Sequence, residues 1–384
     1  MTTTSKTQRT REANGNTQCD FKPPGQIVLV FQGGGALGAF QAGVYEALHD
    51  AGIEPDWVVG TSIGAINGAL ISGNARERRL PRLREFWKRV SSHASPMRHW
   101  HAASATRMMH NMTTVTHGIP GFFSPNPGAW LGAQMPLGVT RAAYYTTDPL
   151  RETLADLVAF NPGAGSKTRL TLGAVNVRNG RMRYFDSHVE DIGLDHILAS
   201  GALPPAFPAV MIDGEPYWDG GLYSNTPIEV VMRDNPRRDS LIFSAQLWQQ
   251  NSEAPESIAQ VMSRQKDIQY ASRAEGQIGM QQEAHSLRHA IRELGELLPD
   301  SVKNRAATHK LLSYGCGTVM HVAELCTPAL DGEDHTKDID FTPASVQARW
   351  QAGREQARLM IESAPWAAPC DPMTGIMMHR VGQG

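Results

Sequence analysis

The sequence has 384 residues, of which 41% are hydrophobic, with 36 Gly and 24 Pro, a balance that excludes a wholly disordered chain and predicts one large globular domain or two. Its 36 Lys and Arg against 38 Asp and Glu give a formal charge of −2, which leaves no basic excess for phosphate backbones, so we expect no nucleic-acid partner. The four cysteines lack CxxC spacing, which fits a reducing compartment and predicts no structural metal: Cys19, Cys316, Cys326 and Cys370.

We expect no export signal at the beginning of this sequence. Residues 1–25 are rich in Thr, Asn, Gln and Arg and lack the apolar core of a secretory signal, so we interpret them as the flexible leader of a cytoplasmic protein. The most apolar stretch, residues 58–72, is interrupted by polar residues and glycines. It falls short of the roughly 20 apolar residues that a membrane-spanning helix needs, and we predict no such helix.

Two strand–turn–helix units come next. Ile27-Val-Leu-Val-Phe31 is a continuous apolar run, typical of a strand buried on both faces of a parallel sheet, and residues 37–50 follow with apolar positions at helical spacing. Residues 57–59 and 63–71 repeat this order. Such units in succession predict an α/β fold, with a mainly parallel central sheet and right-handed crossovers.

Residues 91–145 have a different texture, rich in histidine, methionine, glycine, proline and phenylalanine. A helix over residues 80–90, with Pro81 in its first turn, precedes them. We interpret the stretch as an insertion over the sheet, either a lid or pocket wall or an irregular packing segment. Irregular spacing and few acidic neighbours argue against metal ligation by its five histidines: His93, His99, His101, His110 and His117.

The remaining chain predicts two hairpins and a mainly helical end. The hairpin turns are Asn179-Gly180 and Asp213-Gly214. We interpret residues 240–247 as the last core strand, and residues 251–384 as a helical C-terminal extension. Its last helix is capped near Thr342-Pro343 and docks one apolar face on the core. The other expected elements are a helix over 148–160, strands over 168–177, 181–185, 210–212 and 215–218, a short helix from 228, and helices from 254 with Ile258, Val261, Met262, Ile268 and Ala271 at helical spacing.

The segment Gly60-Thr-Ser-Ile-Gly64 fits the GxSxG pattern between a predicted strand and a predicted helix. A turn of this kind holds its serine in a strained, exposed position from which the hydroxyl can attack a carbonyl carbon. The flanking Gly60 and Gly64 remove side chains that would clash. Ser62 is therefore the candidate nucleophile, although a glycine-rich turn with an incidental serine would carry the same letters.

A second glycine cluster, made of Gly33, Gly34, Gly35 and Gly38, ends the first predicted strand. Its backbone N–H groups, aided by the helix dipole, can hold a developing oxyanion. A phosphate cradle is the alternative, because Gly33, Gly35 and Gly38 also match GxGxxG and Asp56 stands where a dinucleotide site would have its acidic residue. The GK[ST] ending of a P-loop is missing.

The third motif is Asp219-Gly220-Gly221, at the end of a predicted strand. Glycines beside an aspartate let its carboxylate approach another group closely, as a general base must. An ordinary turn aspartate is the alternative.

In this order, the three motifs resemble those of the patatin-like phospholipase family: a GGGxxG oxyanion loop, a GxSxG nucleophile elbow and a DG[GA] base motif. The resemblance extends over residues 26–247, and the later chain resembles a helical extension of a bacterial subset. It implies a three-layer α/β/α catalytic domain over residues 26–250 and a hydrolase of lipid acyl esters. Many members carry Arg or Lys where this chain has Leu37, so this chain lacks a positive charge for anionic head groups there.

The resemblance implies a Ser-Asp dyad, in which Asp219 takes the proton of Ser62 while Gly34 and Gly35 stabilise the oxyanion. A Ser-His-Asp triad is the alternative, since six histidines follow Asp219 in the chain: His285, His289, His309, His321, His335 and His379. A lipid-binding module without turnover is a second alternative, against which the three intact motifs argue.

We expect a lipid or other acyl-ester substrate, with short esters and hydroxyalkanoate oligoesters left open. The apolar residues 119–123 fit either an acyl-chain pocket or core packing. No EF-hand loop or compact carboxylate cluster is present, so we expect no metal or other cofactor. A cytoplasmic protein with peripheral contact to the inner membrane is the expectation, and the sequence leaves the oligomeric state open.

Overall fold

In the computed structural model, the described residues are 23–91, 113–159, 167–330, 333–369 and 374–381. The expected leader therefore lies, up to residue 22, outside the described residues, as do residues 92–112 with four of the five histidines of the insertion. Cys316 and Cys326 are free thiols, whereas Cys19 and Cys370 fall outside the described ranges.

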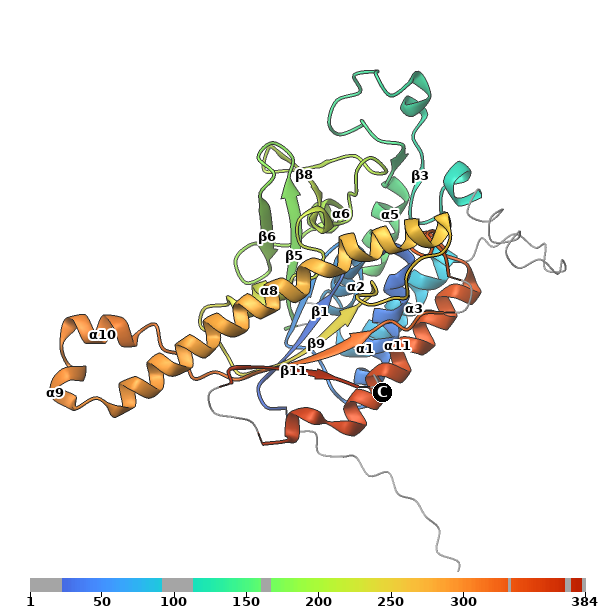
Figure 1. Cartoon of the computed structure of the whole chain (residues 1–384). Helices are drawn as coiled ribbons and strands as arrows, with labels where there is room; N and C mark the ends of the chain where they lie inside the picture. Colours follow the sequence, from blue (N-terminus) through green and yellow to red (C-terminus); the bar gives the residue numbers. More distant parts are fainter. Residues whose placement is uncertain (1–22, 92–112, 160–166, 331–332, 370–373, 382–384) are drawn as a thin grey trace, which may run out of the picture.

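A mixed sheet with mostly parallel strands forms the centre of the molecule (Figure 1). Within the described residues it has nine strands in the order β11-β10-β9-β1-β2-β5-β8-β7, with β6 paired to β5. The six strands from β11 to β5 run parallel, while β6, β7 and β8 pair antiparallel with their neighbours. The bounds are β1 Gln26–Phe31, β2 Trp57–Gly60, β5 Arg169–Asn176, β6 Met182–Asp186, β7 Val210–Ile212, β8 Glu215–Asp219, β9 Ser240–Gln246, β10 Met320–Cys326 and β11 Ile376–Arg380. Both predicted hairpins, β5–β6 and β7–β8, are confirmed.

Helices cover both faces of the sheet and make three layers, because alternate β1 side chains enter two separate apolar clusters. Leu29 and Phe31 pack with one layer of helices, and Val28 and Val30 with the other. The first layer contains α1 (Ala39–Asp50), α2 (Ile63–Ser72), α3 (Arg76–Ser91) and α11 (Pro343–Ser363); the second contains α7 (Ile228–Met232) and α8 (Ile258–Leu297). The three-layer α/β/α prediction is confirmed.

Two helix boundaries differ from those predicted. α3 begins at Arg76, so Pro81 lies in the second turn rather than the first. The polar run before Leu80 offered no apolar periodicity that would have indicated this earlier start. α5 spans Asp148–Leu157 and so ends before residue 160. The smaller helical elements are η1 Gly35–Gly38, η2 Pro127–Leu131, α6 Leu194–Ser200, η3 Gly220–Leu222, α9 Asp300–Lys303, α10 Ala306–Leu312 and η4 Pro365–Ala367.

The last third of the chain is largely helical, as predicted, but it also completes the sheet. β9 is not the last core strand: β10 pairs with it in parallel, and β11 pairs with β10. These two strands, of seven and five residues, were missed because both pair in parallel, so neither belongs to a hairpin with a turn motif beside it. α11 docks on the core as predicted, and it packs against α1 so closely that a Cβ on Gly353 would lie 2.0 Å from the Phe40 carbonyl oxygen.

α8 is 40 residues long and extends past the sheet toward α9 and α10 (Figure 1). Its helical state is confirmed, but of the five apolar residues on which the prediction rested only Ala271 is buried. The other four are exposed: Ile258, Val261, Met262 and Ile268. Among the helices of the described residues, none combines the length and apolarity needed to cross a membrane.

Candidate active site

Ser62 stands in the turn between β2 and α2, with a backbone φ of 57° and ψ of −124°. A non-glycine residue at positive φ is strained, and this strain is typical of a nucleophile elbow. The Ser62 N–H donates to the backbone oxygen and the hydroxyl oxygen of Ser200, each at 3.1 Å, and the Ser200 hydroxyl donates to the Gly173 carbonyl. These bonds from α6 and β5 hold the strained turn in place.

The two glycines of the elbow are required by close backbone contacts. A Cβ on Gly60 would lie 2.4 Å from the Gly64 oxygen, and one on Gly64 would lie 2.3 Å from the Phe31 oxygen. The turn therefore packs directly against β1, and any side chain at either position would push Ser62 out of place.

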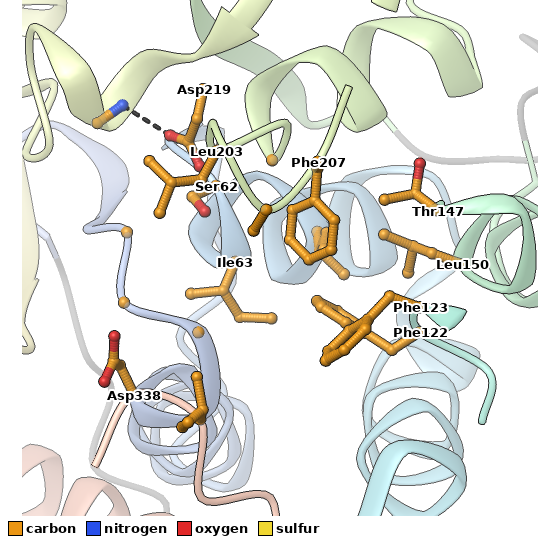
Figure 2. Close-up of a pocket in the computed structure, with 18 of the residues that line it drawn as sticks. Ser62, Ile63, Phe122, Phe123, Thr147, Leu150, Leu203, Phe207, Asp219 and Asp338 are labelled. Atoms are coloured by element: carbon orange, nitrogen blue, oxygen red, sulfur yellow. Dashed lines mark hydrogen bonds between the residues drawn. The ribbon is translucent and has the colours of Figure 1, made fainter. Parts of the chain in front are cut away.

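Asp219 ends β8, opposite Ala174 of β5, and its side chain points toward Ser62 (Figure 2). The carboxylate is buried and accepts a 2.7 Å hydrogen bond from the Gly221 N–H. Burial raises the pKa of Asp219 to about 7, while the Gly221 N–H and a hydrogen bond with the Ser62 side chain act in the opposite direction. A carboxyl group with this pKa exchanges a proton near neutral pH, as a general base must.

The glycine loop presents its free N–H groups beside Ser62. The N–H groups of Gly34 and Gly35 have no hydrogen-bond acceptor among the described residues, and neither does that of Ile63, the residue after the serine. All three residues line the same cavity as Ser62. Free donors at such a place suit an oxyanion. Gly38 does not line the cavity; a Cβ there would lie 2.5 Å from the Ile63 side chain, so it serves close packing of η1 on α2.

Three residues that sequence reasoning did not single out hold this glycine loop. Asn225 bonds Gly33 through its side-chain N–H (3.0 Å) and its own backbone oxygen (3.1 Å). The indole N–H of Trp248 also donates to the Gly33 oxygen, at 2.7 Å. The backbone oxygen of Asp338, from the C-terminal region, accepts from the Ala36 N–H at 2.8 Å. The only signal for Asn225 was its place in the sequence after Asp219; the other two form no motif.

These groups meet at one polar corner of a cavity of about 250 Å³. The rest of its wall is largely apolar and aromatic, with Phe122, Phe123 and Phe207 in edge-to-face contact (Figure 2). Further apolar lining residues are Ile66, Leu150, Leu198, Leu203, Ile339 and Phe341. Of residues 119–123, Phe122 and Phe123 line the cavity and also belong to the core, whereas Ile119 belongs to the core alone. A lipid-like acyl chain fits the chemistry of this wall.

The described histidines that follow Asp219 do not line this cavity. His285 and His289 both bond the Thr318 oxygen, and His321 pairs with His379. No group of three or more potential metal ligands occurs in the described part of the chain. The geometry thus gives the triad alternative no support.

The dinucleotide alternative fails on topology. Asp56 precedes β2 and accepts the Ile27 N–H at the start of β1, whereas the glycine loop follows the end of β1. Because β1 and β2 are parallel, Asp56 lies at the amino ends of these strands and the glycine loop at their carboxyl ends. Leu37, at the position where the family resemblance led us to expect Arg or Lys, is buried in the core.

Comparison with known proteins gives matches over most of the chain. A model of patatin-like phospholipases matches residues 29–232, a little over half of the chain, and a second model, of a patatin phospholipase, matches residues 268–373.

Curated relatives match over short stretches. Lysophospholipase nte1 of Aspergillus terreus is 57% identical over 49 residues, which are 13% of this chain and 3% of that protein. Patatin-like phospholipase domain-containing protein 6 of Homo sapiens is 43% identical over 72 residues, 18% of this chain and 5% of that protein. The chain therefore spans only a small part of these relatives. Among solved structures, VipD from Legionella pneumophila has 14% identity and a TM-score of 0.36, over 89% of this chain and 67% of that one.

Proposed function

The chain belongs to the patatin-like phospholipase family, and from this premise we propose that it hydrolyses lipid acyl esters with a Ser62–Asp219 dyad. The observation that carries the proposal is the contact of a strained elbow serine with a buried carboxylate of raised pKa, at the polar corner of an apolar cavity. The stretches shared with the curated relatives are short, 49 and 72 residues, so the lipid substrate is part of this proposal.

The chemistry runs in two steps. Asp219 takes the hydroxyl proton as Ser62 attacks the ester carbonyl, the N–H groups of Gly34, Gly35 and Ile63 stabilise the oxyanion, and the alcohol leaves with the proton held by Asp219. Asp219 gives that proton to the departing alcohol. It then takes a proton from a water molecule that attacks the acyl-serine ester, and it returns this proton to the Ser62 oxygen as the fatty acid leaves. No metal or other cofactor enters either step. The aromatic wall around Phe122 and Phe207 holds the acyl chain.

Labelling with a fluorophosphonate ester tests the nucleophile. We expect one adduct, mapped by mass spectrometry to Ser62, which Ser62→Ala abolishes and Ser313→Ala, at an exposed serine of α10's end, does not. Folded protein without an adduct would favour the lipid-binding module instead.

Acyl esters of graded chain length then test the substrate class. We expect turnover to rise as the acyl chain becomes long enough to fill the apolar cavity, whereas a preference for short esters would favour the carboxylesterase or oligoester alternative.

Single replacement of each histidine after Asp219 tests the triad alternative. Turnover should stay intact in every variant if no triad operates.

A further inference from the structure

Exposed apolar side chains gather on the β3–β4 loop (residues 126–144), between β3 (Ser124–Pro125) and β4 (Tyr145–Thr146). Trp130 is 84% and Leu131 63% exposed, and Met135, Val139 and Tyr144 are exposed as well. The loop projects beyond the body of the molecule, at the top of Figure 1. Large apolar side chains that face solvent together are typical of an interaction surface.

Both ends of this loop belong to the cavity wall. Phe123 precedes β3 and Tyr145 begins β4, and both line the cavity that contains Ser62. The Tyr145 N–H donates to the oxygen of Ala206, another lining residue, at 2.9 Å. The loop therefore stands on the rim of the candidate active site.

The base of the loop has a fixed shape. The Asn126 side chain donates to the oxygens of Arg141 and Ala143 and accepts from the Gly128 N–H, which bridges the two arms of the loop. The Ala209 N–H donates to the Val139 oxygen and so joins the loop to the segment between Phe207, which lines the cavity, and β7. The exposed Trp130 and Leu131 are thus presented by a braced scaffold.

The charge of this region selects the partner. The chain has 38 Asp and Glu among 384 residues, yet none lies between Thr113 and Thr147, where Arg141 is the one fixed cation. A surface without carboxylates avoids repulsion by anionic lipid and the cost of moving acidic groups into the head-group layer. Tryptophan and tyrosine, each with an apolar ring and a polar atom, are the side chains that favour a membrane–water interface.

We propose that the β3–β4 loop docks this protein on a phospholipid bilayer, with Trp130 and Leu131 inserted among the lipids and the cavity rim lowered onto the surface. The proposal rests on the proposed function for the use of the site, since docking brings a lipid ester to the mouth of the cavity. Burial of each large apolar side chain supplies the affinity, and Arg141 adds attraction to anionic lipid.

The test measures binding separately from hydrolysis. Ser62→Ala protein, which cannot consume the lipid, is floated with vesicles of phosphatidylcholine, alone or mixed in equal parts with phosphatidylglycerol. Leu131→Asp in this background is the test variant. Leu287→Asp on α8 is its matched control, because Leu287 is 66% exposed, similar to Leu131, but lies on a different element.

We expect binding to both vesicles, tighter with phosphatidylglycerol. Leu131→Asp should weaken it at least about tenfold, while Leu287→Asp should leave it unchanged. On a water-soluble short ester, Leu131→Asp alone should keep wild-type turnover, because Leu131 does not line the cavity. Wild-type binding by Leu131→Asp, an equal loss in both variants, or no binding at all would overturn the proposal.

Sedimentation of the two variants addresses a second copy of the chain as the occupant. If Leu131→Asp turned a dimer into a monomer, the loop would be a protein interface and the bilayer proposal would fail. A missing adduct at Ser62 together with binding that depends on Leu131 would instead refute only the proposed hydrolase.

Discussion

Two stretches of the chain build the cavity in different ways. The stretch matched as patatin-like, residues 29–232, supplies Ser62, Asp219 and the glycine loop through short motifs whose residues are neighbours in sequence. The stretch matched by the second model, residues 268–373, supplies single residues, such as Asp338 and Phe341, from segments without a motif. The first carries the proposed reacting groups and much of the apolar wall, and the second adds single contacts to the glycine loop and to the wall.

The comparison is tested first at the proposed base. Asp219→Asn should lower turnover by about 10²–10⁴-fold, because the amide cannot accept the serine proton. In the wild type, kcat/KM for a soluble ester should fall as pH drops below about 7, where Asp219 becomes protonated. Wild-type turnover by Asp219→Asn would contradict the proposed role of Asp219 as the general base.

The same variant has an expected stability effect of defined sign. Because the pKa of about 7 in the folded state lies above the 3.8 of an unperturbed aspartate, the folded state binds a proton more tightly, and Asp219 costs stability as pH rises from 4 to 7. The full cost is about 4 kcal/mol above pH 7, at 1.36 kcal/mol per pKa unit. In denaturant unfolding, the free energy of unfolding of Asp219→Asn should therefore rise relative to that of the wild type between pH 4 and pH 8. Below pH 4 the difference should not change with pH.

The contact between the two stretches is tested at Gly35. Its φ is +55°, and a Cβ there would lie 2.3 Å from the Asp338 oxygen, so Gly35→Ala should displace the oxyanion loop and lower kcat by about 10²–10³-fold. Gly52→Ala is the control, since Gly52 also has a positive φ (+76°) but no atom near its Cβ position. Equal losses in both variants would mean that backbone strain, and not the contact with Asp338, is responsible.

The C-terminal stretch itself is tested at a buried ion pair. Lys337 and Asp267 are joined at 2.8 Å, with side chains only 6% and 7% exposed. Lys337→Met should lower the free energy of unfolding by about 3–5 kcal/mol, because Asp267 keeps a buried charge without its main partner. Arg358→Met, which breaks exposed pairs on α11, should change stability far less, because solvent screens ion pairs at the surface. Chemical denaturation compares the two.

The smallest expected effect is at Lys266, whose ammonium group donates to both carboxylate oxygens of Asp338 and to the His335 oxygen. Lys266→Met should loosen the segment that accepts the Ala36 N–H. Because the pair is partly exposed, it contributes at most about 1 kcal/mol, so kcat should fall no more than about fivefold with KM unchanged. A larger change in KM than in kcat would point to a role in binding instead.

The sequence predicted the features that are local. Three examples are the turn at Ser62, the Asp-Gly-Gly motif at Asp219 and the hairpin at Asn179-Gly180. Each consists of a few consecutive residues whose backbone conformation requires certain amino acids, so the sequence alone indicates it. β10 and β11 were missed because each is defined by its parallel neighbour in the sheet, and that neighbour lies far away in sequence.

The same limit explains the residues missed in the site. The bond from the Ala36 N–H to Asp338 uses a backbone oxygen, which every amino acid carries, so no letter records it. α8 gave a correct helical pattern, yet Ile258 and Met262 face solvent, because periodicity shows that one face is apolar but not what covers it.

The place of β9 in the sheet has a consequence for how the protein is made. β9 lies between β1 and β10, and β10 leaves the ribosome long after β9 does. Until then the nascent chain carries an unpaired strand edge, which invites aggregation, and its glycine loop lacks the contact with Asp338. A fragment cut after residue 250 would keep both defects permanently. The sheet and the cavity wall are thus completed only late in translation, when β10 and the segment around Asp338 have been made.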